Sequence, residues 1–168
     1  MFAYMGGKKV HSKWISPWIP SDFKTYVEVF GGAMWIYWMS NKVPVKTNVY
    51  NDFNRHLSNI FYCASKEPAR FRDALESYAN DLHNDDVFEE FKNEVFDVFD
   101  TDFTMPNVEL AAKYIFCQTQ TFAGNTNLTR DSKIYKHPDV DIRGRPYTQK
   151  YNSFIHKLKD SDYLKKLG

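Results

Sequence analysis

The sequence has little cysteine, no long hydrophobic run and almost no net charge. Its two cysteines, Cys63 and Cys117, lack Cys-x-x-Cys spacing, which argues against a disulfide framework or a zinc site and favours buried free thiols in a reducing cytoplasm. No apolar run approaches the roughly 20 residues that span a bilayer. The N-terminus has no charged segment followed by a signal-type apolar stretch. These features predict a soluble intracellular chain.

The charge balance neither requires nor excludes contact with nucleic acid. Lys and Arg number 22 and Asp and Glu number 21, so the formal net charge is +1. Any binding to DNA must therefore come from a locally basic surface and not from the total charge. The 168 residues, of which 43% are hydrophobic and 17% aromatic, are enough for one domain with a substantial core.

An apolar stretch that carries one carboxylate and ends in two glycines is the most informative part of the chain. Tyr26 to Phe30, with Glu28 inside it, is typical of a buried strand in a parallel sheet. Gly31 and Gly32 follow, and glycines let a backbone approach a ligand without interference from Cβ. Ala33 to Ser40 is almost wholly apolar and predicts a helix whose aromatic residues pack in the core. Ligands of open α/β sheets bind at the carboxyl ends of strands, so this glycine turn is a candidate ligand site.

A second short strand, Thr47 to Tyr50, leads into a polar loop, Asn51-Asp52-Phe53-Asn54. Asp52 follows Glu28 by 52 − 28 = 24 positions. A carboxylate placed some 20 residues beyond a glycine turn in a β-α-β unit can accept hydrogen bonds from a ribose. Alternatively, Asp52 caps a helix from His56 to Ser65, and Asn54 suits either role.

A second glycine pair precedes the first strand, in Tyr4-Met5-Gly6-Gly7-Lys8-Lys9. Taken alone, Gly6 and Gly7 suit an ordinary loop before a helix over 10–19. Next to the glycine turn after Phe30, the same segment becomes a candidate cradle for an anion or another ligand.

The middle of the chain has helical periodicity and no further strand-like alternation. Helical periodicity covers Ala69 to Asp81 and Asp86 to Phe99, with acidic residues on solvated faces, and a third helix is predicted over Val108 to Gln120. Phe154 to Leu167 predicts a lysine-rich amphipathic helix. The middle part therefore reads as a helical insertion.

The stretch from Thr119 to Arg130 is polar and rich in amides, which are side chains that can read base edges from a loop. The alternative is a solvated loop without such a role. The following stretch is the most basic of the chain, with interleaved tyrosines, and suits contacts with phosphates. Its basic residues are Lys133, Lys136, His137, Arg143, Arg145 and Lys150.

The order of these pieces resembles the Dam-type DNA adenine-N6 methyltransferases. The resemblance implies an α/β fold, a partial Rossmann-like methyltransferase sheet of parallel strands and helices with a mostly helical insertion. It implies AdoMet (S-adenosyl-L-methionine) as cofactor, double-stranded DNA as partner, and a bacterial or phage-infected host cell. We accordingly expect an AdoMet-binding part over 1–67, a DNA-recognition insertion over 68–150 and a return helix over 151–168. The implied AdoMet-binding residues are Tyr4, Gly6, Gly7, Lys8, Glu28, Phe30, Gly32 and Asp52, and the implied DNA-binding residues are Asn125, Asn127, Arg130, Lys133, Lys136, Arg143 and Arg145.

The sequence departs from this family in several places. Within the insertion the match around Gly124 is partial, so the target sequence is not predicted. Val29 stands where the family usually has proline, and Met34 replaces a smaller residue and could crowd the floor of the pocket. The Asp-Pro-Pro-Tyr segment that holds the target adenine in the family has no counterpart: His137-Pro138-Asp139-Val140 and Gly144-Arg145-Pro146-Tyr147 lie in basic loop sequence without a preceding strand.

These departures predict a truncated or split amino-terminal half of such an enzyme, without catalytic residues of its own and inactive alone. A second polypeptide or a second copy would complete the sheet. The alternatives are a non-catalytic remnant that binds DNA or a partner chain, and a helical domain whose resemblance to the family is coincidental.

Overall fold

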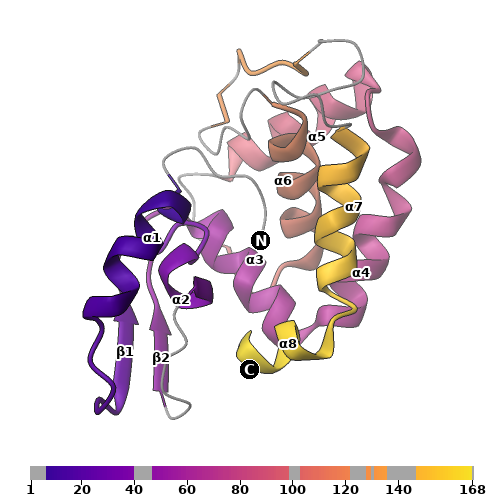
Figure 1. Cartoon of the computed structure of the whole chain (residues 1–168). Coiled ribbons are helices and arrows are strands. Elements are labelled where there is room, and N and C mark those ends of the chain that lie inside the picture. The colour runs from indigo at the N-terminus through magenta and orange to yellow at the C-terminus, as the bar shows by residue number, and fades with distance from the viewer. Residues whose placement is uncertain are drawn as a thin grey trace.

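The computed structural model describes residues 7–39, 47–98, 103–121, 128–129, 131–135 and 147–167. Within them the protein is a mixed α/β structure that is mostly helical (Figure 1). In chain order the elements are α1 (Lys9–Ile15), η1 (Ser16–Trp18), β1 (Thr25–Glu28), α2 (Trp35–Met39), β2 (Thr47–Tyr50), α3 (Arg55–Lys66), α4 (Pro68–Ser77), η2 (Ala79–Asp81), α5 (Asp85–Asp97), α6 (Val108–Gln120), α7 (Tyr147–Lys157) and α8 (Ser161–Leu167).

The two predicted strands form a two-stranded parallel sheet. Thr25 lies opposite Thr47 and Glu28 lies opposite Tyr50, so both strands end at the same edge of the sheet. Glu28 is buried whereas Val27 is exposed, as expected for alternating side chains. The parallel β-α-β arrangement is thus confirmed for the described residues, and a larger Rossmann-like sheet stays a prediction.

The helices form the larger part of the molecule, beside the sheet (Figure 1). Helix α6 lies at the centre of this part and packs against α3, α4, α5 and α7. Its sequence is apolar on nearly every side, as expected for a helix surrounded by others. Helix α3 lies between the sheet and the helical part and joins them into one core.

Several element boundaries differ from the sequence prediction. Strand β1 ends at Glu28 and not at Phe30, and the helix predicted over Ala69–Asp81 is divided into α4 and η2. Three further differences have identifiable reasons. Helix α2 begins at Trp35 because the preceding turn includes two non-glycine residues with positive φ, Phe30 and Met34. The first helix ends at Ile15, and its remainder becomes the 3₁₀ helix η1, which has proline in its first turn. The C-terminal helix is two helices, because the Asp160 side chain accepts hydrogen bonds from the backbone of residues 162 and 163 and starts α8 anew.

Both cysteines are buried free thiols, as predicted. Burial raises the pKa of the Cys63 thiol to about 12, so it is an unreactive core residue. Across the part of the chain that the structure describes, no helix has the length and apolar character needed to cross a membrane.

Candidate functional site

The turn after β1 has an unusual backbone. Phe30, Gly32 and Met34 have φ values of 58°, 52° and 53°. The left-handed conformation is open to glycine but costs other residues roughly 1–2 kcal/mol each. Such strain persists only where the surroundings hold it, and it is common at ligand sites. Met34 is buried in the core, so its side chain helps to hold the turn in place.

Asp52 joins the glycine turn to the end of β2. One carboxylate oxygen accepts the N–H of Gly32 at 2.8 Å, and the other accepts the N–H of Asn54 at 2.9 Å. The cap of α3 is Asn54, whose side chain accepts the N–H of His56 at 3.0 Å. The alternative that Asp52 caps this helix is therefore wrong. Asp52 instead ties the two strand-end loops together.

Tyr50 explains why residue 31, the first of the two glycines in the turn, has no side chain. A Cβ added at Gly31 would lie 2.4 and 2.7 Å from carbons of the Tyr50 ring, closer than such atoms can approach. The Tyr50 hydroxyl donates to the carbonyl of Gly32 at 2.9 Å, which holds the ring over the turn. The backbone of the turn is also bonded directly to the second loop, since Gly31 N–H donates to the carbonyl of Asn51 at 2.9 Å.

Lys8 brings the N-terminal glycine segment to the same place. Its ammonium donates to the carbonyl of Phe30 at 3.1 Å, across 22 positions of sequence. Gly7 precedes it and is half-buried. The structure therefore gathers the predicted residues Gly7, Lys8, Phe30 and Gly32 at one end of the sheet. Tyr4 and Gly6 lie outside the described residues.

Glu28 is a buried carboxylate with one oxygen satisfied and one unsatisfied. Its side chain is 7% exposed, and Oε2 accepts from the Tyr26 hydroxyl at 3.0 Å and from the Tyr37 N–H at 3.3 Å. Oε1 has no hydrogen-bond partner in the part of the chain that the structure describes. Burial raises the pKa of Glu28, although its hydrogen bonds and the charge of Lys8 act in the opposite direction.

Two large aromatic side chains are exposed to solvent at the end of the sheet where Glu28 and Asp52 lie. Phe30 is 71% exposed in the glycine turn, and Phe53 is 88% exposed between Asp52 and Asn54. Phe53 was not among the residues predicted from sequence. Its signal was an aromatic residue inside an otherwise polar loop, where the core offers no packing reason for it. Exposed aromatic faces next to glycine backbone are suited to an apolar or aromatic ligand.

The amide-rich stretch from Thr119 to Arg130 begins inside α6, with buried side chains. The Thr119 hydroxyl donates back to the carbonyl of Ile115 at 2.8 Å, within the helix. The Gln120 side chain accepts the N–H of His83 at 2.7 Å, and the Gln120 carbonyl accepts the N–H of Tyr135 at 2.9 Å. Thr119 and Gln120 are therefore buried helix residues and not part of a solvated loop, and Gln120 also binds the segments around residues 83 and 135.

The described residues 128–129 and 131–135 contain an anchor to α5. Leu128 and Ile134 are buried, and the ammonium of Lys92, itself 2% exposed, donates to the carbonyl of Ser132 at 3.0 Å. The charge of Lys92 is balanced by Glu89, 2.7 Å away. Lys133 is exposed next to this anchor. The other predicted DNA-contact residues lie outside the described residues: Asn125, Asn127, Arg130, Lys136, Arg143 and Arg145.

The family model of the D12 class N6 adenine-specific DNA methyltransferases matches residues 4–162. The chain belongs to this family. The match runs through both glycine segments, the Asp52 loop and the helical part, so it covers every element described above except α8, of which it includes only the first two residues. A comparison with curated proteins gives no match.

The candidate site lies in a part of the chain where, among the described residues, no group of three or more metal-ligating side chains occurs. Its polar groups are backbone amides, one buried carboxylate and one bridging carboxylate. Such groups suit an organic ligand that has both a charged end and an aromatic end.

Proposed function

We propose that this chain binds AdoMet at the glycine turn and serves in site-specific methylation of adenine N6 in double-stranded DNA. The proposal rests on the way three segments are bonded together at the carboxyl ends of the two strands. There Asp52 and Lys8 bind the backbone of the turn, and an unsatisfied oxygen of Glu28 lies in the strand leading into it. A family match over 4–162 supports the reaction class.

The residues at this edge fit the three parts of AdoMet. Glu28 can accept a hydrogen bond from the ammonium of the methionine part through its free Oε1. Asp52 uses each oxygen once, and a carboxylate has about four acceptor positions, so it can also accept from the ribose hydroxyls. Phe30 and Phe53 offer exposed aromatic faces to the adenine. When bound, AdoMet supplies the methyl group that the reaction transfers.

Calorimetric titration with AdoMet and with its demethylated product tests this assignment. We expect a saturable signal with the wild type and at least about tenfold weaker binding with Glu28→Gln, because the neutral amide cannot pair with an ammonium. Glu90→Gln, a change of the same kind at an exposed position of α5, is the matched control and should leave the affinity unchanged. A folded wild-type chain that gives no signal at millimolar AdoMet would contradict the proposal.

We also propose that the segment after α6 and the basic residues after it contact DNA. Support comes from the bond between Lys92 of α5 and the carbonyl of Ser132, next to which Lys133 is exposed. Fluorescence anisotropy with duplex DNA should show affinity that falls steeply with salt. Lys133→Ala should reduce the salt slope by about one, as expected for one phosphate contact. Lys66→Ala, an exposed lysine at the end of α3, serves as the control.

The transfer step needs a segment that this sequence does not contain. A polar clamp for the exocyclic amine and an aromatic partner for the flipped base are both required, and no Asp-Pro-Pro-Tyr occurs in the 168 residues. We therefore propose that these 168 residues bind AdoMet and DNA and that the catalytic segment comes from elsewhere. Incorporation of labelled methyl groups into DNA by this chain alone would contradict that view. A non-catalytic remnant would bind DNA with the same affinity with and without AdoMet.

A further inference from the structure

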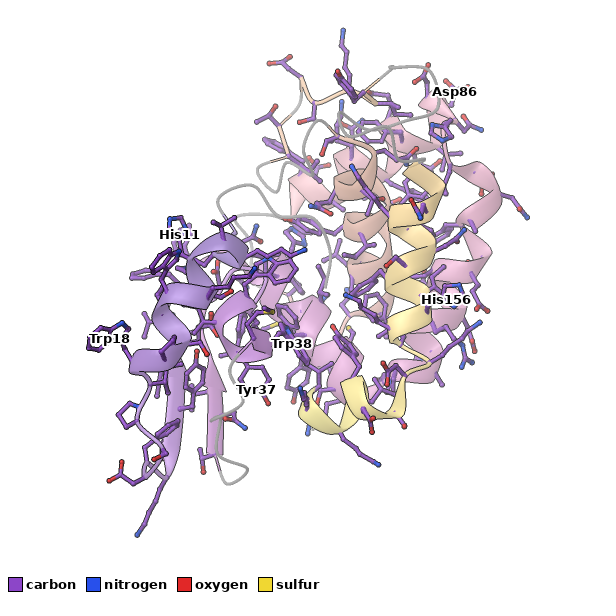
Figure 2. All side chains as sticks on the ribbon, viewed as in Figure 1. His11, Trp18, Tyr37, Trp38, Asp86 and His156 are labelled. Carbon is purple, nitrogen blue, oxygen red and sulfur yellow. The ribbon has the colours of Figure 1, made fainter. Side chains whose placement is uncertain are left out.

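Helix α2, which directly follows the glycine turn, is held by the C-terminal helix α8. The Trp38 ring stacks on the Tyr163 ring with 4.6 Å between centroids and 12° between planes. The neighbouring Tyr37 hydroxyl donates to the carbonyl of Lys166. Figure 2 shows Tyr37 and Trp38 extending from α2 in the region between the sheet and α8. Some 125 positions of sequence separate Trp38 from Tyr163.

The short length of α2 makes these contacts important for its position. It has five residues, and a helix of one turn and a half is not stable without contacts to the rest of the protein. Its first turn is continuous with the strained residues of the glycine turn. Contacts that fix α2 therefore also fix the direction in which the chain leaves that turn.

Tyr37 connects α8 to the buried carboxylate. Its backbone N–H donates to Oε2 of Glu28 at 3.3 Å, while its hydroxyl binds the backbone of α8. Its ring also lies against Tyr26, the second donor to the same oxygen, with 5.9 Å between centroids. A displacement of α8 would thus change how the Glu28 side chain is held.

Tyr163 acts through its ring and not through its hydroxyl. The side chain is 8% exposed, and its hydroxyl has no hydrogen-bond partner in the described part of the chain. Helix α8 packs on α3 as well, and α3 begins immediately after the Asp52 loop. The helix therefore supports the elements that follow both strand-end loops.

We propose that α8 positions the glycine turn for AdoMet, with the Tyr163 ring and the Tyr37 hydroxyl as positioning residues that do not touch the cofactor. This inference rests on the proposed AdoMet site. It adds a part of the chain, residues 161–167, that the site residues themselves do not include.

The test compares two substitutions of Tyr163. Tyr163→Leu removes the stacked ring, and calorimetry should show AdoMet affinity at least about threefold weaker, within the range of effects transmitted by packed neighbours. Tyr163→Phe keeps the ring and removes only the unpaired hydroxyl, so it should bind AdoMet as the wild type does. Tyr37→Phe removes the bond to Lys166 and should weaken binding, although its backbone bond to Glu28 remains.

A variant that is destabilised far from the glycine turn shows whether Tyr163→Leu weakens binding by misplacing the turn or only by lowering overall stability. Phe88→Leu alters a buried residue of α5, on the helical side of the core. It should lower the stability without changing AdoMet affinity. Equal weakening by Phe88→Leu and Tyr163→Leu would overturn the proposal.

Hydrogen exchange without ligand gives a readout that does not depend on AdoMet. In Tyr163→Leu the amides of residues 31–38 should exchange faster than in the wild type, whereas in Phe88→Leu they should not. Unchanged exchange in Tyr163→Leu would overturn the positioning role of α8. If exchange is faster in Tyr163→Leu but the wild type does not bind AdoMet, then α8 supports the turn and the proposed function is wrong.

Discussion

The carboxylate of Asp52 accepts the backbone N–H of Gly32 at 2.8 Å, across 20 positions of sequence and between two different loops. This bond, together with the bond to Asn54, makes Asp52 a structural link as well as a candidate ribose ligand. The two roles predict different consequences of its replacement.

We expect Asp52→Asn to lower the free energy of unfolding by about 1–3 kcal/mol. The amide retains one acceptor oxygen, so one of the two backbone N–H groups loses its partner and faces another donor. Urea denaturation measures the loss, and AdoMet titration should show weaker binding as well. Asp73→Asn, at an exposed position of α4, is the control. Full stability of Asp52→Asn would show that the link between the loops is unimportant.

Gly31→Ala should destabilise the protein by about 1–3 kcal/mol, the usual cost of forcing extra volume into a packed site. The clash is with the Tyr50 ring, so it should depend on that ring. In a double-mutant cycle, Gly31→Ala should cost less in a Tyr50→Leu background than in the wild type. Equal costs in the two backgrounds would contradict this explanation.

Phe30→Gly should change stability and ligand affinity in opposite directions. Phe30 has φ of 58° and is 71% exposed, so glycine relieves a left-handed strain of roughly 1–2 kcal/mol while little packing is lost. The greater freedom of glycine in the unfolded chain offsets part of this gain. Thermal unfolding should show equal or higher stability, and calorimetry should show weaker AdoMet binding. Tighter binding by the glycine variant would exclude Phe30 from the site.

Local sequence patterns predicted the elements well where caps and periodicity agree. The helix over Val108–Gln120 and the strand over Thr47–Tyr50 have the predicted bounds, and Asn107 caps the former by accepting the N–H of Leu110. Both patterns depend on residues a few positions apart, so they can be read from the chain directly.

The links that hold the site together could not be read in this way. Asp52 with Gly32, Lys92 with Ser132 and Trp38 with Tyr163 connect distant positions, and no local pattern marks them. Lys92 looks like one more charge on a solvated helix face, yet its side chain is 2% exposed. Only the three-dimensional contact between α5 and Ser132 shows its role.

His56 should make stability depend on pH. It is fully buried, stacked between Tyr114 and Phe103 with centroid distances of 5.0 and 5.5 Å. Burial lowers its pKa from 6.5 to about 4, although a hydrogen bond to the Val95 backbone acts in the opposite direction. The unfolded state therefore binds the proton first as the pH falls. The stability is complete above about pH 6.5 and is lost progressively toward pH 4.

The expected loss between pH 7.5 and pH 5 is about 2 kcal/mol, since one pKa unit corresponds to about 1.4 kcal/mol. Urea denaturation at several pH values measures it. His56→Phe keeps an aromatic ring in the stack and should remove most of this slope. His156→Gln changes an exposed histidine of α7 (Figure 2) and should retain it. If the free energy of unfolding of His56→Phe falls with pH as steeply as that of the wild type, the pH dependence comes from other groups.

The outer face of the sheet should mediate self-association. Val27 and Val49 lie opposite each other in register and are 52% and 42% exposed, and Val29 continues the same face. Trp14 and Trp18 add exposed apolar surface from α1 and η1, and Trp18 points away from the rest of the molecule (Figure 2). Parallel sheets are normally covered on both faces, and two strands alone are marginal.

A second copy of the chain is the partner that is always present, so light scattering on the purified protein should give a mass of at least two chains. Val27→Lys places a charge on the exposed apolar face and should shift the mass toward one chain. Lys24→Ala, at an exposed position just before β1, should leave the mass unchanged. A wild-type mass of one chain across the measured concentrations would contradict association through this face.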